Sequence, residues 1–309
     1  MKLSLTTPVK LNNGVEMPIF GLGTFLSERG DATRKAVLDA LEAGYRHIDT
    51  AAIYGNEADV GAGVCESGLP RAQVFITTKV WNDEQGYDST LRAFDASLER
   101  LKMDYVDLYL IHWPVTGKRL DTWRALIHLY EQKRCRAIGV SNFTIRHLKE
   151  LAVQITASAE QAGQGGPRPP ERPIVEDRPS TVQAGSPLVP MVNQFELHPF
   201  NTRKELVAYC QEMGIAVTSY SPLARGRKLA NPTLTAIASR YHKTPAQVAI
   251  RWVLQQGIIV IPKSVHRERI IENAQVFDFE IAPADMAALD GLNENYSVVP
   301  SDWAPDKWV

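Results

Sequence analysis

Eight short apolar runs, each followed by a stretch with helical periodicity, limit the possible folds of this sequence more than any other feature. Alternation of this kind is typical of repeated βα units around a parallel sheet. Eight units favour an α/β protein with a closed (β/α)8 barrel, a TIM barrel, over an open sheet of five or six strands. The predicted strands are Pro18–Gly23, Arg46–Asp49, Val74–Lys79, Val106–His112, Ala137–Ser141, Met191–Glu196, Ala216–Tyr220 and Ile258–Pro262.

Two segments depart from this alternation. Asn12-Asn13-Gly14 separates two short alternating runs, which predicts an N-terminal β-hairpin. Between the fifth helix and the sixth strand, residues 156–190 form a connection of 35 residues in which 11 are Pro or Gly and none is aromatic. Such a composition does not bury enough apolar surface to order itself. We therefore predict a single barrel domain over residues 1–309 that carries a flexible surface insertion. An insertion that the fold merely tolerates is favoured over a segment that binds a partner.

The charge balance and the cysteines exclude several classes of protein. Lys and Arg number 34 against 35 Asp and Glu, so no net positive field attracts nucleic acid or a membrane surface. Three widely separated cysteines without a CxxC motif indicate neither a disulfide framework nor a structural zinc site. The first residues lack the apolar stretch of a signal peptide, and no apolar run is long enough to span a bilayer. We expect a cytoplasmic protein that acts on a small molecule.

Four ionisable side chains follow three neighbouring predicted strands. Asp49 ends the second strand, Tyr54 lies in the loop after it, Lys79 ends the third and His112 ends the fourth. Because the C-terminal strand ends form the active-site face of such barrels, we expect the four to converge. An ion pair between Lys79 and Asp49 is expected, and the lysine should lower the pKa of Tyr54 from about 10 toward neutrality. Tyr54 is then a candidate proton donor, with His112 bonding the same substrate oxygen.

A proton donor of this kind suits the reduction of a carbonyl group, which needs a hydride from a cofactor. No Rossmann fingerprint is present, because the glycine pairs at positions 21 and 23 and at 61 and 63 lack the third glycine. Polar side chains at the ends of the fifth and sixth strands can instead pair with a carboxamide, and Tyr220 at the seventh can stack on a planar ring. The polar residues are Ser141, Asn142 and Gln194.

A basic segment follows the eighth strand and begins a helix. Barrels often bind phosphate near strands seven and eight at a helix N-terminus, where free N–H groups favour anions. Lys263 and Arg269 add two cations, and Arg can contact a phosphate in bidentate fashion. A phosphorylated ribose would fit this segment, whereas a solvated basic helix start is the preferred interpretation when the segment is taken alone.

Together these segments resemble the aldo-keto reductase family over nearly the whole chain. The resemblance rests on Gly44 to Ala51 (GYRHIDTA), Leu110 to Pro114 (LIHWP), Gly139 to Phe143 (GVSNF) and Ile261 to Val265 (IPKSV). It is strongest to microbial and protozoan members similar to diketogluconate reductases and prostaglandin F synthases. The short 115–121 loop and compact 293–309 tail favour an open, permissive pocket.

The resemblance implies NADPH-dependent reduction of aldehydes and ketones by a monomer, with Asp49, Tyr54, Lys79 and His112 as the catalytic residues. Substrates would be small aldehydes, dicarbonyls, or a prostaglandin-type ketone or endoperoxide. Phe25, Trp81 and Trp113 would line the substrate pocket. The cofactor would be held by Gly23, Thr24, Ser141, Asn142, Gln194, Tyr220, Ser221, Leu223, Lys263, Ser264, Val265, Arg269, Glu272 and Asn273.

Two other functions are weighed. A metallohydrolase could use His47, Asp49, Lys79, His112 and His198. The spacing argues against it, because no second carboxylate follows the eighth strand, and we expect no metal. A non-enzymatic regulatory or structural protein could bind the cofactor on the same fold. The complete set of four ionisable residues argues against that alternative.

Overall fold

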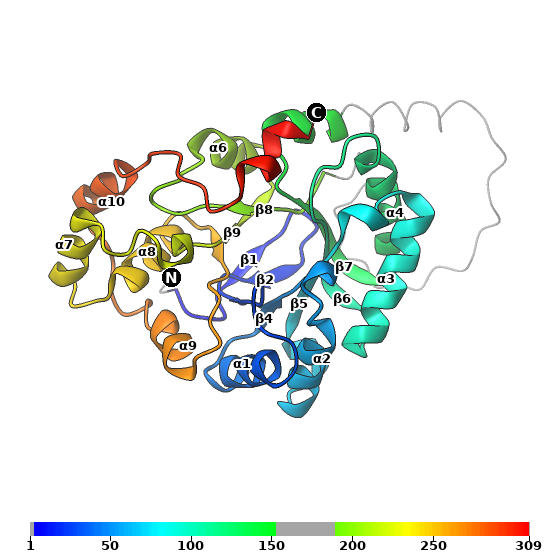
Figure 1. The fold of residues 1–309 in the computed structure, drawn as a ribbon, viewed down its shortest axis with the longest axis horizontal. Helices are drawn as coiled ribbons and strands as arrows, with labels where there is room; N and C mark the ends of the chain where they lie inside the picture. The colour runs from blue at the N-terminus through cyan, green and yellow to red at the C-terminus, as the bar shows by residue number, and fades with distance from the viewer. Residues whose placement is uncertain (1–2, 153–188, 309) are drawn as a thin grey trace.

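A computed structural model describes residues 3–152 and 189–308, and its strands form a closed barrel surrounded by helices (Figure 1). Each strand of the sheet pairs in parallel with the next one along the chain. Bridges from Phe20 to Val260 and from Gly23 to Lys263 join the first strand region to the last. The predicted (β/α)8 barrel is confirmed. Its strands are β3 (Leu22–Gly23), β4 (His47–Asp49), β5 (Phe75–Val80), β6 (Val106–Ile111), β7 (Cys135–Ser141), β8 (Val192–Glu196), β9 (Ala216–Tyr220) and β10 (Ile259–Val260).

Helices cover the outside of the barrel (Figure 1), and their buried apolar side chains join the hydrophobic core. Their ends follow local capping rules: Thr244 and Gln247 form a capping box, with Pro245 in the first turn. Residues 145–152 are helical as well. The named helices are α1 (Asp31–Glu42), α2 (Glu57–Glu66), α3 (Tyr87–Leu101), α4 (Arg119–Glu131), α6 (Lys204–Glu212), α7 (Pro232–Arg240), α8 (Pro245–Leu254), α9 (Arg267–Ala274) and α10 (Pro283–Asp290).

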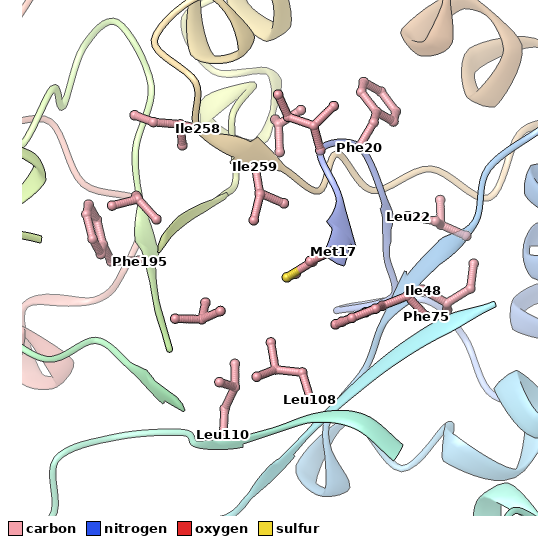
Figure 2. Close-up of a cluster of buried hydrophobic side chains, with 14 of the residues drawn as sticks. Met17, Phe20, Leu22, Ile48, Phe75, Leu108, Leu110, Phe195, Ile258 and Ile259 are labelled. Carbon is pink, nitrogen blue, oxygen red and sulfur yellow. The ribbon is translucent and has the colours of Figure 1, made fainter. Parts of the chain in front are cut away.

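The predicted hairpin is present and covers the N-terminal end of the barrel. Its antiparallel strands are β1 (Pro8–Lys10) and β2 (Glu16–Pro18), and the turn between them contains Gly14 with a φ of +86°, which glycine adopts easily. Met17 is fully buried and lies among side chains of the barrel strands (Figure 2). Apolar side chains therefore fill the N-terminal end of the barrel. A binding site can form only at the opposite end, where the strands have their C-terminal residues.

Several predicted boundaries are wrong by a few residues. The first barrel strand contains only Leu22 and Gly23, because Pro18 pairs within the hairpin instead. The eighth is equally short, β5 extends one residue past Lys79, and β6 ends one residue before His112. The predicted insertion lies outside the described residues except for its last two positions, so it stays a prediction. No helix in the described part of the chain has the length and apolarity that crossing a membrane requires.

Candidate active site

The C-terminal strand ends surround a cleft of about 1000 Å³. Two predicted site residues do not line it: Lys79 is fully buried behind the wall, and the Thr24 hydroxyl donates to the main-chain oxygen of Asp49. All the other predicted site residues line the walls of this cleft. They are Gly23, Phe25, Asp49, Tyr54, Trp81, His112, Trp113, Ser141, Asn142, Gln194, Tyr220, Ser221, Leu223, Lys263, Ser264, Val265, Arg269, Glu272 and Asn273.

A buried ion pair lies beneath the cleft floor. Lys79 Nζ is 2.6 Å from Asp49 Oδ1 and also donates to the carbonyl oxygen of Thr50 at 2.8 Å. The second carboxylate oxygen, Asp49 Oδ2, accepts from Gln194 Nε2 at 2.7 Å. Burial lowers the pKa of Lys79 and raises that of Asp49, while the contact between the two groups opposes both shifts. The expected ion pair is present, and it fixes the position of the lysine.

Tyr54 closes a short 3-10 turn, Ala52–Tyr54, after β4. Lys79 Nζ lies 5.2 Å from the centroid of its ring and forms its ion pair with Asp49. Burial of the phenol, together with the negative charge of Asp49, raises the pKa of Tyr54 well above its usual value. The prediction that Lys79 lowers this pKa is wrong, because desolvation of the phenol and the negative charge of Asp49 set the direction of the shift. Tyr54 is therefore a fully protonated phenol at neutral pH.

His112 follows β6 and stands beside Tyr54, with ring centroids 5.6 Å apart. Burial and the charge of Lys79 lower the pKa of His112 well below its usual value, so the imidazole is neutral. Its Nδ1 atom has no hydrogen-bond partner among residues 3–152 and 189–308. The backbone is fixed by Asn142 Nδ2, which donates to the carbonyl oxygen of His112 at 3.0 Å. A neutral imidazole at this position can donate or accept one hydrogen bond in the cleft.

The histidines counted for a metal site do not assemble. His47 Nε2 bonds the hydroxyl of Thr77 inside the barrel at 3.1 Å, and His198 Nε2 lies 2.9 Å from Glu196 Oε1. Within the described ranges, no group of three or more His, Cys, Asp or Glu side chains is arranged to hold a metal ion. These histidines have structural partners instead.

Polar side chains at the ends of β7, β8 and β9 form one wall of the cleft. Tyr220 Oη donates to Asn142 Oδ1 at 2.7 Å, and Ser141 Oγ donates to the main-chain oxygen of Gln194 at 2.9 Å. Asn142 itself has a φ of +63°, a conformation that asparagine tolerates better than most residues. These bonds hold the aromatic ring of Tyr220 and the side-chain amide of Asn142 in fixed positions, and the amide of Gln194 is held by its bond to Asp49.

The segment after β10 forms the far arm of the cleft. Lys263 and Arg269 are exposed and make no ion pair in the described part of the chain. Partial burial lowers the pKa of Lys263, an effect that the charge of Glu28 opposes. By contrast, Arg267, on the same helix as Arg269, binds Asp39 at 2.5 Å. Two cations without anionic partners at the start of α9 suit an anionic ligand group.

Aromatic side chains form the remaining wall, and one of them is missing from the sequence-based prediction. Trp303 stacks on Trp81 with centroids 5.5 Å apart and meets Trp113 edge-on at 5.5 Å. It belongs to the 293–309 tail, which therefore supplies part of the cleft wall, and the open, permissive pocket stays a prediction. Two tryptophans within the last seven residues are the sequence signal that could have revealed the contact. Leu26, Ile53, Arg225 and Val299 also line the cleft without having been predicted.

Comparison with known proteins identifies the family. The model of the aldo/keto reductase family matches residues 19–294, and the chain belongs to this family. It is 49% identical to glyoxal reductase of Bacillus subtilis, with 97% of this chain and 98% of the relative aligned. It is 46% identical to the 9,11-endoperoxide prostaglandin H2 reductase of Trypanosoma cruzi, covering 93% and 92%.

Solved structures of the family agree with the fold. An aldo-keto reductase from a Medee basin deep-sea metagenome library superposes with a TM-score of 0.81 at 41% identity, covering 94% of this chain and 97% of that one. A Bombyx mori aldo-keto reductase in complex with NADP gives a TM-score of 0.79 at 36% identity, covering 98% and 97%. The resemblance inferred from the sequence is confirmed.

Proposed function

We propose that this protein reduces aldehydes and ketones to alcohols with NADPH, using Tyr54 as the general acid. One observation carries the proposal: a protonated tyrosine and a neutral histidine stand side by side in the cleft, above the buried pair of Lys79 and Asp49. A carbonyl oxygen placed against both rings would meet a proton donor and a second hydrogen-bonding group.

The residues of the cleft fit a phosphorylated nicotinamide dinucleotide. The Tyr220 ring offers a stacking surface, and the amides of Asn142 and Gln194 offer donors and acceptors for a carboxamide. Farther along, Arg269 and Lys263, which have no ion-pair partner among the described residues, suit the 2′-phosphate that distinguishes NADPH from NADH. When bound, such a cofactor supplies the hydride that no side chain can provide. The NADP bound to the Bombyx mori relative supports this choice.

Tyr54 and His112 would then act on the substrate oxygen, Lys79 on Tyr54, and Asp49 on Lys79. As negative charge develops on the carbonyl oxygen, Tyr54 Oη donates its proton to that oxygen, and His112 orients the oxygen by a hydrogen bond. The phenolate left behind is stabilised by Lys79, 5.2 Å from the ring, and is reprotonated from solvent. Asp49 keeps Lys79 in place. The low dielectric of the site strengthens each of these interactions.

The aromatic wall favours neutral carbonyl compounds. Trp81, Trp113 and Trp303 present apolar faces, and the charged residues Lys263 and Arg269 lie in the arm assigned to the cofactor. Small aldehydes and 1,2-dicarbonyls are the proposed substrates, which agrees with the glyoxal reductase relative. A prostaglandin-type ketone or endoperoxide is the alternative suggested by the Trypanosoma cruzi relative.

The pH profile of kcat/KM tests the protonation states. The pKa of His112 is lowered and that of Tyr54 is raised, so neither group changes its charge between about pH 6.5 and pH 10, their ordinary pKa values. We expect a flat profile for reduction across this range, with activity lost only above it as Tyr54 ionises. An inflection near pH 6.5 that disappears in His112→Gln would show that this histidine titrates normally.

Cofactor preference tests the role of Arg269. Arg269→Ala should raise the KM for NADPH by roughly tenfold or more, the effect of losing a charge-assisted contact, and should leave the KM for NADH unchanged. Arg267→Ala is the matched control, because its guanidinium is two residues away on the same helix and is already paired with Asp39. Equal effects of the two substitutions, or equal losses with both cofactors, would show that Arg269 does not bind the 2′-phosphate.

A further inference from the structure

The carboxylate of Glu196, at the end of β8, holds the chain segment that follows α10. Its Oε1 accepts from the backbone amide of Val298 at 2.7 Å, and its Oε2 accepts from Ser297 Oγ at 2.5 Å and from the amide of Val299 at 3.4 Å. His198 Nε2 lies 2.9 Å from Oε1 on the other side. Glu196 is almost completely buried, so these contacts are shielded from water.

The segment fixed in this way leads directly to the aromatic wall. Val299 and Pro300 line the cleft, and Trp303 follows three residues later, packed on Trp81 and Trp113. The far end is also attached, because the carbonyl oxygen of Trp308 lies 2.7 Å from His147 Nε2. Trp303 therefore stands between two anchored points.

We propose that Glu196 is a positioning residue for substrate selection: by binding residues 297–299, it sets Trp303 as the wall against which flat, apolar substrates bind. The proposal rests on the function proposed above and concerns the same cleft. Glu196 touches neither Tyr54 nor His112, so it acts on the binding of large substrates and leaves the proton donor untouched.

This arrangement separates substrates by size. A compound that fills only the space at Tyr54 and His112 gains nothing from the Trp303 ring. A compound carrying an aromatic group reaches that ring and gains the stacking contact, which is worth up to about tenfold in affinity. Methylglyoxal and phenylglyoxal make a matched pair, because both present an aldehyde next to a ketone and they differ in a methyl or phenyl group.

The test compares KM and kcat for these two compounds in wild type, Glu196→Ala, Glu196→Gln and Trp303→Ala. We expect Glu196→Ala to raise the KM for phenylglyoxal by roughly tenfold, the value of an aromatic contact, with less than about a twofold change for methylglyoxal or in either kcat. Glu196→Gln keeps one acceptor oxygen for the Val298 amide, so its KM for phenylglyoxal should lie between those of wild type and Glu196→Ala. Ser297→Ala, which removes one donor without emptying a buried site, should show a smaller effect of the same kind.

The double variant Glu196→Ala/Trp303→Ala separates positioning from general damage. If Glu196 acts through Trp303, the double variant should be no worse toward phenylglyoxal than Trp303→Ala alone. Additive losses, or equal losses with methylglyoxal and phenylglyoxal, would overturn the proposal. Wild type that consumes NADPH with neither compound, nor with other aldehydes, would instead refute the proposed function, and the inference would fall with it.

Discussion

Tyr54→Phe should bind NADPH like the wild type and lose about 10²- to 10⁴-fold in kcat, the range expected when a general acid is removed. The phenylalanine keeps the ring and its contacts with Phe25 and His112, whose centroids lie 5.0 and 5.6 Å away, so the pocket keeps its shape. The proton that must reach the substrate oxygen is lost. The measurement is NADPH oxidation at saturating aldehyde, paired with titration of NADPH binding by fluorescence.

A matched control for this variant is Tyr87→Phe, at the start of α3 and exposed outside the cleft. It should leave both turnover and NADPH binding unchanged. Near-normal turnover by Tyr54→Phe would show that another group donates the proton. Loss of NADPH binding in that variant would show that the hydroxyl is needed for the cofactor and would leave its role as an acid unsupported.

Lys79→Met should abolish turnover and also destabilise the fold by about 3–5 kcal/mol, the usual result of leaving one charge of a buried pair without its partner. Asp49 is almost completely inaccessible, and Lys79 supplies its 2.6 Å contact. Urea unfolding, followed through tryptophan fluorescence, measures the change in the free energy of unfolding.

The double variant Asp49→Asn/Lys79→Met separates stability from catalysis. Replacing both charges removes the unpaired carboxylate, so the free energy of unfolding should recover toward wild type, while turnover stays lost because nothing stabilises the Tyr54 phenolate. If the double variant regains activity together with stability, the ion pair supports the fold and takes no part in the reaction.

The barrel could be predicted from the sequence because its strands are buried on both faces. Strands such as β5 and β6 are rich in apolar residues with no alternation of apolar and polar positions, and the strand order follows the chain order. The ends of the first and last strands were harder to predict. Apolar residues continue past the ends of the strands: Ile19 and Phe20 precede β3, and Ile261 follows β10. Hydrophobicity alone does not show where the backbone hydrogen bonds between neighbouring strands end.

The identity of the site residues was predictable, but the electrostatics of the site were not. Position at a strand end identifies Tyr54 and Lys79 as neighbours, yet it does not say how the charge of the lysine is used. In the structure Lys79 donates to Asp49 and to Thr50, and desolvation of the phenol then determines the direction of the pKa shift of Tyr54. Burial is a property of the folded chain that strand ends do not reveal.

Trp303 was missed for a different reason. Its contacts with Trp81 and Trp113 join residues about two hundred positions apart, from a tail without regular helical or strand periodicity. The hydrogen bonds that direct the tail are accepted by Glu196, a single carboxylate at the end of β8. Pattern-based reasoning predicts repeating elements well, and it has no means of placing a tail held by single side-chain contacts.

The most direct test of the proposed function is to mix the purified full-length protein with NADPH, and separately with NADH, and to follow the loss of nicotinamide absorbance with a panel of aldehydes, quinones and dicarbonyls. We expect consumption of NADPH in preference to NADH, with an alcohol formed from each substrate that reacts. Binding of NADPH without consumption across the whole panel would contradict carbonyl reduction and favour a non-enzymatic role. Failure to bind either cofactor would contradict the assignment of the cleft itself.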